Sequence, residues 1–161
     1  MSVLEINNIK KKFGNNEVLR GISFSLEEGE VLSVIGSSGS GKTTLLRCLN
    51  FLERADEGTI AVDGNVIFDA SQKGRVSERE IRKMRLNFGL VFQDFNLFPQ
   101  YSVMDNLLLA PKLLAKEDPE FKHNKKEIFA QIEEKAASLL AKVGLSDKKD
   151  AYPCELSGGQ K

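Results

Sequence analysis

The octapeptide Gly36-Ser37-Ser38-Gly39-Ser40-Gly41-Lys42-Thr43 matches the pattern G-x-x-x-x-G-K-[ST]. Its glycines allow the backbone to wrap closely around a polyphosphate, because they adopt conformations that side chains exclude. Consecutive backbone N–H groups can then point inward as a nest for an anion. The loop leads into a predicted helix, whose N-terminus adds a partial positive charge. The octapeptide therefore predicts a binding loop for the phosphates of a nucleotide.

Three side chains at the end of this loop have the chemistry that a bound nucleotide needs. Lys42 can reach the β and γ phosphates, the Thr43 hydroxyl can ligate Mg²⁺, and Thr44 can donate to the α phosphate. A Gly/Ser-rich turn with a stray lysine is the alternative. The apolar run before the loop and the helical pattern after it favour the nucleotide site.

The sequence around the loop predicts a strand before it and a helix after it. Val31–Ile35 is a short apolar run, which indicates a fully buried strand. Residues 42–51 carry leucines at helical spacing. The other predicted strands are 3–6, 22–26, 59–62, 65–68 and 88–92, with Asp63-Gly64 as the tight turn of a hairpin between 59–62 and 65–68. The other predicted helices are 77–86, capped by Ser77 with Glu80, 102–115, capped by Ser102 with Asp105, and 128–143, ended by Gly144. Residues 116–126 are predicted to be an exposed charged loop. Antiparallel strands followed by strand–helix alternation indicate an α/β fold with an added β layer.

The composition is that of a globular domain. Of the 161 residues, 41% are hydrophobic and 29% are charged, and 23 basic residues balance 23 acidic ones. This balance argues against a protein that coats nucleic acid. Two cysteines are too few for a disulfide framework, and no apolar run approaches the length of a membrane span. We therefore expect a cytosolic protein without nucleic acid as a partner.

Three further segments carry a resemblance to a known family. Leu156-Ser157-Gly158-Gly159-Gln160 is identical to the signature pentapeptide of the ABC ATPases. Gln93 follows a predicted strand, as the Q-loop glutamine of that family does, and Phe13 stands where the family places an aromatic that stacks on adenine. The resemblance covers essentially the whole chain. It implies a P-loop NTPase core with an N-terminal antiparallel β layer and a helical subdomain.

This resemblance implies ATP and Mg²⁺ as ligands and gives roles to residues outside the octapeptide. Phe13 is expected to stack on the base, with Val18 in the strand that follows. Gln93 is expected to ligate Mg²⁺ together with Thr43 and to orient water. Lys42 and Gln93 are accordingly the two catalytic candidates.

The signature is expected to repeat the chemistry of the loop. Ser157 and Gln160 can form a capping box, which leaves the N–H groups of Gly158 and Gly159 open at a helix N-terminus. In the family this end contacts the γ phosphate of ATP held by the other subunit. The nucleotide-binding candidates are Phe13, Val18, Ser37, Ser38, Gly39, Ser40, Gly41, Lys42, Thr43, Thr44, Ser157, Gly158, Gly159 and Gln160.

The segment after Gln93 narrows the resemblance to one group of transporters. Residues 93–99 and 102–107 look like the ATPases of polar amino acid importers, and ATPases for methionine import or lipoprotein release share much of this pattern. In the family this region forms a cleft that receives a coupling helix of the membrane permease. The docking candidates are Phe95, Leu97, Phe98 and Tyr101. We expect at least one or two of them to be partly exposed.

The family's domain continues past the signature, to a strand ending in Asp-Glu, a D-loop and a switch histidine. Its Asp holds Mg²⁺ through water and its Glu polarises the attacking water. We therefore expect residues 1–161 to be the truncated N-terminal part of one ABC ATPase domain, lacking the C-terminal part of the core. About 1–93 and 157–161 belong to the nucleotide-binding core and β layer, and about 94–156 to the helical subdomain. Such a chain is expected to bind ATP weakly and not to hydrolyse it.

The expected whole is an ATP-binding subunit on the cytoplasmic face of a bacterial-type cell membrane. ATP closes a head-to-tail dimer, hydrolysis reopens it, and the permease follows, with a solute-binding protein as an indirect partner. Three alternatives remain open. The first is a chromosome-maintenance ATPase, which needs long coiled-coil arms before the signature. The second is a ribosome-associated ABC protein, which does not explain the importer-like segment. The third is a small-molecule kinase, which leaves the signature unexplained.

Overall fold

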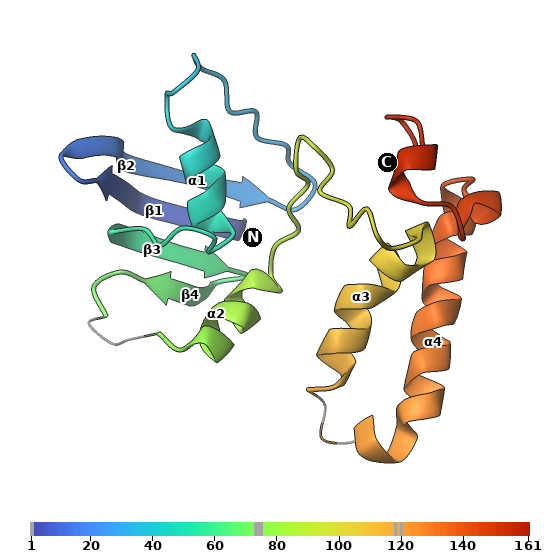
Figure 1. Cartoon of the computed structure of the whole chain (residues 1–161). Helices are drawn as coiled ribbons and strands as arrows, with labels where there is room; N and C mark the ends of the chain where they lie inside the picture. The colour runs from blue at the N-terminus through green and yellow to red at the C-terminus, as the bar shows by residue number, and fades with distance from the viewer. Residues whose placement is uncertain (1, 73–75, 118, 120) are drawn as a thin grey trace. The chain divides into compact units, whose positions relative to one another are not determined.

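The computed structural model describes residues 2–72, 76–117, 119 and 121–161 (Figure 1). The chain divides into a first unit, Met1–Leu90, and a second unit, Val91–Lys161, and each is described by itself. The first unit contains β1 (Ser2–Phe13), β2 (Asn16–Glu27), α1 (Lys42–Leu49), β3 (Glu57–Val62), β4 (Asn65–Asp69) and α2 (Glu78–Arg85). The second contains α3 (Val103–Ala115), α4 (Phe121–Lys142) and the short 3₁₀ turns η1 (Ser146–Lys148) and η2 (Pro153–Glu155).

The first unit is built on a four-stranded antiparallel sheet with the strand order β2-β1-β3-β4. In β1, Ile6 lies opposite Phe24 of β2 on one side and Ile60 of β3 on the other. Strands β3 and β4 form the predicted hairpin across Asp63 and Gly64, whose φ angles of 49° and 74° suit a tight turn. The predicted antiparallel β layer is therefore confirmed.

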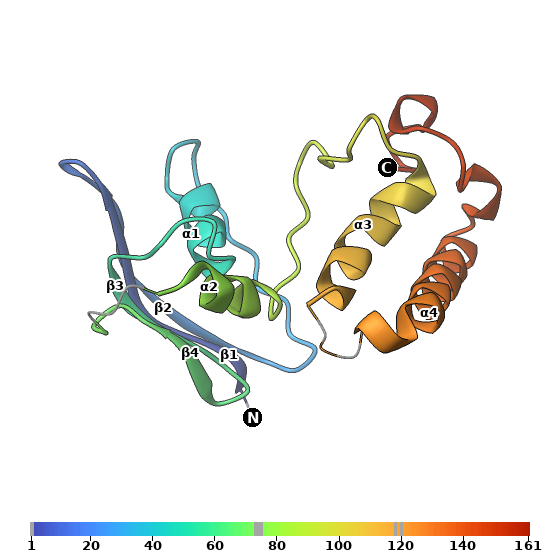
Figure 2. The same cartoon turned by 60° about the horizontal axis from the view of Figure 1, so that its bottom comes forward.

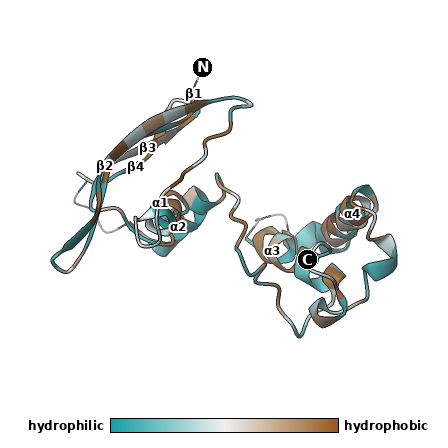
Figure 3. Ribbon diagram, turned by 90° about the horizontal axis from the view of Figure 1, so that it is seen from above, coloured by the Kyte–Doolittle hydropathy of each residue, from teal (hydrophilic) through white to brown (hydrophobic). Residues whose placement is uncertain are grey.

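Helices α1 and α2 lie on one face of this sheet (Figure 2). Figure 3 shows hydrophobic and hydrophilic bands along β1, which do not alternate strictly because register shifts interrupt the strand; Ile6 and Ile9 are its buried apolar residues. Phe51, just after α1, packs its ring against Phe68 and Phe88, with centroid distances of 5.8 Å and 6.1 Å. The buried core contains Ile6, Ile9, Leu19, Leu45, Cys48, Leu49, Phe51, Ala55, Ile60 and Phe68.

Two predicted strands are wrong. The structure has no strand at Val31–Ile35 or at 88–92, and Val31, Ile35 and Val91 each expose 90% or more of their surface. Both runs have the apolar pattern of a buried strand, but a strand also needs a neighbour for its backbone hydrogen bonds. Every strand in the described part of the chain belongs to the one antiparallel sheet, and neither run joins it. Both therefore remain irregular.

Helices α3 and α4 pack side by side in the second unit (Figures 1 and 2). The predicted capping box begins α3, because the Ser102 hydroxyl accepts from the Asp105 N–H at 3.1 Å and the Asp105 carboxylate accepts from the Ser102 N–H at 3.3 Å. The predicted end of α4 is also present, with Gly144 at φ 71° just beyond it. No helix among the described residues has the length and apolar character that crossing a membrane requires.

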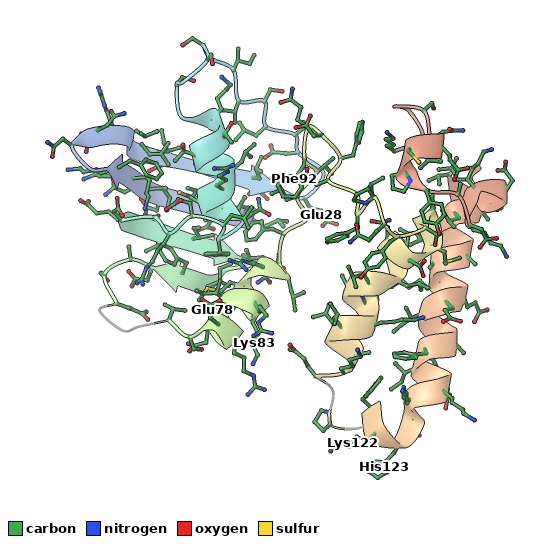
Figure 4. The ribbon with its side chains drawn as sticks, in the orientation of Figure 1. Glu28, Glu78, Lys83, Phe92, Lys122 and His123 are labelled. Atoms are coloured by element: carbon green, nitrogen blue, oxygen red, sulfur yellow. The ribbon has the colours of Figure 1, made fainter. Side chains whose placement is uncertain are left out.

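The predicted exposed loop at 116–126 is instead a helix over 121–126, although residues 122–126 are exposed as predicted, and residues 118 and 120 lie outside the described part of the chain. Helix α4 begins at Phe121, and Lys122 and His123 lie in its first turn (Figure 4). The Phe121 ring packs against Phe129 at a centroid distance of 5.4 Å. Asn124, with φ −119° and ψ 22°, interrupts the helix between the two rings, so this contact folds the short segment before the kink against the helix that follows it.

Candidate nucleotide-binding site

The Gly-rich loop wraps around the N-terminus of α1. Gly41 is the residue before the helix, with φ 95°, and Gly39 has φ 80°, so both adopt the left-handed conformation that favours glycine. A Cβ on Gly41 would stand 3.2 Å from the carbonyl oxygen and the side chain of Val18 and from the side chain of Leu19. A side chain at position 41 would therefore require Val18 or Leu19 to shift by a few tenths of an ångström and would also have to adopt a φ of 95°.

A pocket of about 310 Å³ opens at this helix end. It is lined by Phe13, Val18 and residues 38–44. The structure therefore brings together every predicted nucleotide-binding residue of the first unit except Ser37, whose carbonyl instead accepts a hydrogen bond from Lys42. Backbone N–H groups at a helix N-terminus and flexible glycines make this pocket suitable for a polyphosphate.

The Lys42 ammonium is held by the loop itself. Its Nζ donates to the carbonyl oxygens of Gly36 and Ser37, both at 2.7 Å. Phosphate oxygens are charged acceptors and bind an ammonium more strongly than neutral carbonyls do. Lys42 can therefore exchange these two carbonyls for a phosphate without leaving the loop. Thr43 lines the same pocket, and its hydroxyl could join phosphates and water as a ligand of Mg²⁺.

Phe13 ends β1 at the rim of the pocket and exposes 48% of its surface. Sequence reasoning missed Lys11, which contacts this ring. The Lys11 Nζ lies 5.2 Å from the centroid of the Phe13 ring. The sequence gives no signal of this contact, because Lys11 stands in a run of three lysines and a register shift between Lys11 and Lys12 interrupts the alternation of the strand. The Lys11 ammonium also donates to the Arg54 carbonyl at 2.7 Å and pairs with Glu53 at 3.0 Å and Asp56 at 3.3 Å.

The remaining predicted site residues belong to the second unit. Gln93 lies in an exposed turn near its start. At its other end, the Ser157 N–H donates to Gln160 Oε1 at 3.0 Å, which is one of the two bonds of a capping box. Residues 158–160 form a turn, in which the Gln160 and Lys161 N–H groups both donate to the Ser157 carbonyl oxygen, at 3.0 Å and 3.2 Å. Among the described residues, nothing lies within 4 Å of a Cβ placed on Gly158 or Gly159, so this backbone is open.

The loop before α3 carries the predicted docking residues. Phe95, Phe98 and Tyr101 expose between 36% and 47% of their surfaces. Leu97 and Phe98 line an apolar pocket of about 320 Å³, together with residues of α3, the end of α4 and the signature. Asn106 of α3, which sequence reasoning also missed, lines this pocket and hydrogen-bonds to the loop. An asparagine inside a helical pattern gives no signal of such a role.

Comparison with known proteins places the chain in a family. A family model described as ABC transporter matches residues 19–161. The chain is 45% identical to a probable amino-acid ABC transporter ATP-binding protein of Haemophilus influenzae, covering 99% of this chain and 58% of that protein. It is 42% identical to the glutamine transport ATP-binding protein of Bacillus subtilis and 44% identical to an L-cystine transport system ATP-binding protein of Escherichia coli, of which it covers 58% and 60%.

Solved structures show the same likeness. The chain matches cbiO1 of Clostridium perfringens, described as part of an ABC transporter complex, with a TM-score of 0.73 and 26% identity over 99% of this chain and 57% of that one. It matches a dimeric ATP-binding cassette bound to ADP and Pi with a TM-score of 0.70 and 26% identity, covering 98% of this chain and 64% of that one. The fold is therefore that of an ABC ATPase, in part. The chain spans about 58% of the length of the curated relatives it matches.

Proposed function

The chain belongs to the ABC transporter family, and from this membership we propose that it works in the ATP-binding subunit of an importer for a polar amino acid. The relatives named above are ATP-binding proteins for amino acids, glutamine and cystine, which supports this solute class. Because the chain spans about 58% of their length, the activity of the whole subunit is part of the proposal.

The observation that carries the proposal is the pocket at the N-terminus of α1. Phe13 and Val18 provide an apolar rim for a base, and residues 38–44 provide N–H groups for phosphates. Lys42 moves from the loop carbonyls to the β and γ phosphates, and Thr43 contributes its hydroxyl to Mg²⁺. When bound there, ATP with Mg²⁺ supplies the phosphoryl group whose transfer to water powers transport.

The second unit provides two further groups in this proposal. Gln93 ligates Mg²⁺ and orients water. The open backbone of Gly158 and Gly159 binds the γ phosphate of ATP in a second, head-to-tail subunit, with Ser157 and Gln160 holding the turn. Closing of this dimer on ATP and reopening after hydrolysis drive the permease.

The docking of that permease is assigned to the exposed aromatic loop. Leu97 and Phe98 line an apolar pocket of about 320 Å³, which suits the apolar face of a short helix. The Tyr101 ring packs against Phe98 at a centroid distance of 5.7 Å, and Phe95 is exposed in the same loop. The subunit is then peripheral, at the cytoplasmic face of the membrane, and meets the solute-binding protein only through the permease. Neighbouring genes for a permease and a solute-binding protein would support this assignment, and tandem ATPase domains in the same gene would contradict it.

These 161 residues are proposed to bind ATP without hydrolysing it at a meaningful rate. Phosphoryl transfer needs a positioned water as well as a metal and a lysine. Among residues 1–161, Lys42 and Gln93 are the two groups assigned to this step, and no carboxylate is assigned to polarise the attacking water. The test is release of phosphate from ATP by the purified 161-residue chain. A steady rate that is unchanged in Lys42→Met would come from a contaminating ATPase. A steady rate that Lys42→Met abolishes would contradict the proposal.

Nucleotide binding itself is tested by calorimetric titration of the chain with Mg²⁺ and ATP. We expect saturable binding that weakens at least about tenfold in Lys42→Met, since a lost charge-assisted hydrogen bond is worth about 1.5–3 kcal/mol. The matched control is Lys83→Met in α2, an exposed lysine of the same unit (Figure 4). Equal affinities in Lys42→Met and Lys83→Met would refute the assignment of the pocket.

A further inference from the structure

Lys11 holds one face of the ring at the base-binding end of the pocket. Its Nζ lies over the Phe13 ring, 5.2 Å from the centroid. The lysine is 8% exposed, whereas the phenylalanine is 48% exposed. An ammonium over an aromatic ring is attracted by the ring's negative face, and the attraction grows as the cation is removed from water. The ring therefore already has a partner on one side, while the pocket leaves much of it accessible.

The Lys11 ammonium is bound by three other groups. The Nζ donates to the Arg54 carbonyl at 2.7 Å and pairs with Glu53 at 3.0 Å and with Asp56 at 3.3 Å. Burial lowers the pKa of Lys11, but the hydrogen bonds that its ammonium donates to Glu53 and Asp56, together with the attraction of their charges, outweigh burial, so the pKa is raised and the charge persists. Asp56 also accepts from the Lys12 N–H at 2.7 Å, which ties these groups to the end of β1.

We propose that Lys11 is a positioning residue for the purine base, which fixes the Phe13 ring so that its free face meets the base. The inference rests on the proposed function, since it assumes that ATP occupies the pocket. A phenylalanine at an exposed strand end samples several orientations, and binding must otherwise restrict it at a cost in affinity. Lys11 lowers that cost by holding the ring before the nucleotide arrives. It contacts the ring and makes no contact with the ligand in this proposal.

A purely structural role of Lys11 makes a different prediction. Its bonds to Glu53, Arg54 and Asp56 join β1 to the segment between α1 and β3. If joining these segments were the only role of Lys11, loss of its bonds would disturb the Gly-rich loop as a whole. Binding of every ligand of the pocket would then weaken. A positioning role affects only ligands that have a base. Inorganic tripolyphosphate therefore separates the two roles, because it keeps the phosphates of ATP and lacks the purine.

The experiment compares Lys11→Met and Lys11→Arg by titration with ATP and with inorganic tripolyphosphate, each with Mg²⁺. We expect Lys11→Met to weaken ATP about threefold to tenfold, the range of a partly buried cation–π contact, and to leave tripolyphosphate unchanged. Lys11→Arg keeps a cation over the ring and should restore ATP binding. The control is Lys112→Met, because the Lys112 Nζ stands 5.1 Å from the centroid of the Phe129 ring in the second unit.

The same change in a Phe13→Ala background completes a double-mutant cycle. If Lys11 acts through the ring, Lys11→Met has no further effect on ATP binding once Phe13 is absent. Equal losses of ATP and tripolyphosphate affinity, or an undiminished Lys11→Met effect in Phe13→Ala, would overturn the positioning role while leaving the proposed function standing. A wild-type chain that binds neither ligand would instead overturn the proposed function, and the positioning role with it.

Discussion

The side-chain amide of Asn106 bonds both backbone groups of Phe98. Asn106 Oδ1 accepts from the Phe98 N–H at 2.8 Å, and Nδ2 donates to the Phe98 carbonyl at 3.1 Å. The same Nδ2 lies within hydrogen-bond distance of the Tyr101 and Ser102 carbonyls, at 3.2 Å and 2.9 Å. One side chain of α3 therefore fixes the loop that presents the exposed aromatic residues.

Removing this amide should release the loop. In Asn106→Ala the Phe98 N–H loses its partner, so we expect its hydrogen exchange to accelerate and the unfolding free energy of the second unit to fall by about 1–3 kcal/mol. Exchange measured by mass spectrometry or NMR reports the effect directly. As a control, Asn87→Ala removes an amide that bonds the Lys83 and Met84 carbonyls of the first unit. Unaltered exchange at Phe98 in Asn106→Ala would contradict this role.

Two glycines of the nucleotide loop should respond unequally to alanine. Gly39 and Gly41 both have positive φ, so either substitution introduces backbone strain of about 1 kcal/mol. Only Gly41 adds a steric conflict, because its Cβ would stand 3.2 Å from Val18 and Leu19, whereas nothing among the described residues lies within 4 Å of a Cβ on Gly39. Chemical unfolding should therefore show Gly41→Ala to be the less stable variant. Equal unfolding midpoints would show that the loop is not packed as described.

Local signals were enough to predict the elements whose hydrogen bonds close within a few residues. The hairpin at Asp63-Gly64 and the capping boxes at Ser77 and Ser102 each depend on residues close together in the chain. The runs at 31–35 and 88–92 have an equally good strand pattern, yet neither forms a strand. A buried strand depends on a neighbour that can lie anywhere in the sequence, and an apolar run does not reveal whether that neighbour is present.

The capping box of α2 predicts a pH effect on stability. Hydrogen bonds from the Ser77 hydroxyl and from the Ser77 N–H lower the pKa of Glu80. A carboxyl whose pKa is lowered by folding stabilises the protein above its ordinary pKa, and this contribution is lost as the pH falls through the lowered value. In urea unfolding between about pH 5 and 3, the loss of stability should be shallower in Glu80→Gln than in the wild type.

The matched control for this effect is Glu78→Gln, which removes a carboxyl from the same first turn of α2 (Figure 4). It keeps the bonds between Ser77 and Glu80. The slope of stability against pH should therefore stay close to the wild-type slope in Glu78→Gln. If stability fell equally slowly with decreasing pH in Glu80→Gln and Glu78→Gln, the bonds between Ser77 and Glu80 would not be the cause of the pH effect.

The two cysteines should differ sharply in reactivity. Cys48 is fully buried in the core, and burial raises the pKa of its thiol to about 11, whereas Cys154 is exposed. Because the thiolate is the reactive form, one thiol per chain should react with a disulfide reagent in the native state at pH 8, and the second only in denaturant. Cys154→Ser should abolish the native reaction. Two rapidly reacting thiols would show that α1 is not packed on the sheet.

The candidate site was predictable where its residues follow one another in the chain. Spacing alone identified the loop up to Thr44, because a phosphate loop is a single turn whose backbone does the binding. Lys11 escaped notice because its partner Asp56 is 45 positions away, and a lysine in a charged strand has no pattern that indicates burial. Asn106 was missed for a similar reason, because its bonds to Phe98 span a loop whose conformation the sequence does not specify.

Binding of ATP at the N-terminus of α1 is tested most directly by amide NMR of the ¹⁵N-labelled chain. Addition of Mg²⁺ and ATP should shift the amide signals of residues 38–44 and of Phe13. The size of these shifts, plotted against the ATP concentration, should follow one saturable binding curve. Lys42→Met should greatly reduce the shifts. Signals of that loop that stay in place while others move, or that move equally in Lys42→Met, would contradict a nucleotide site in this pocket.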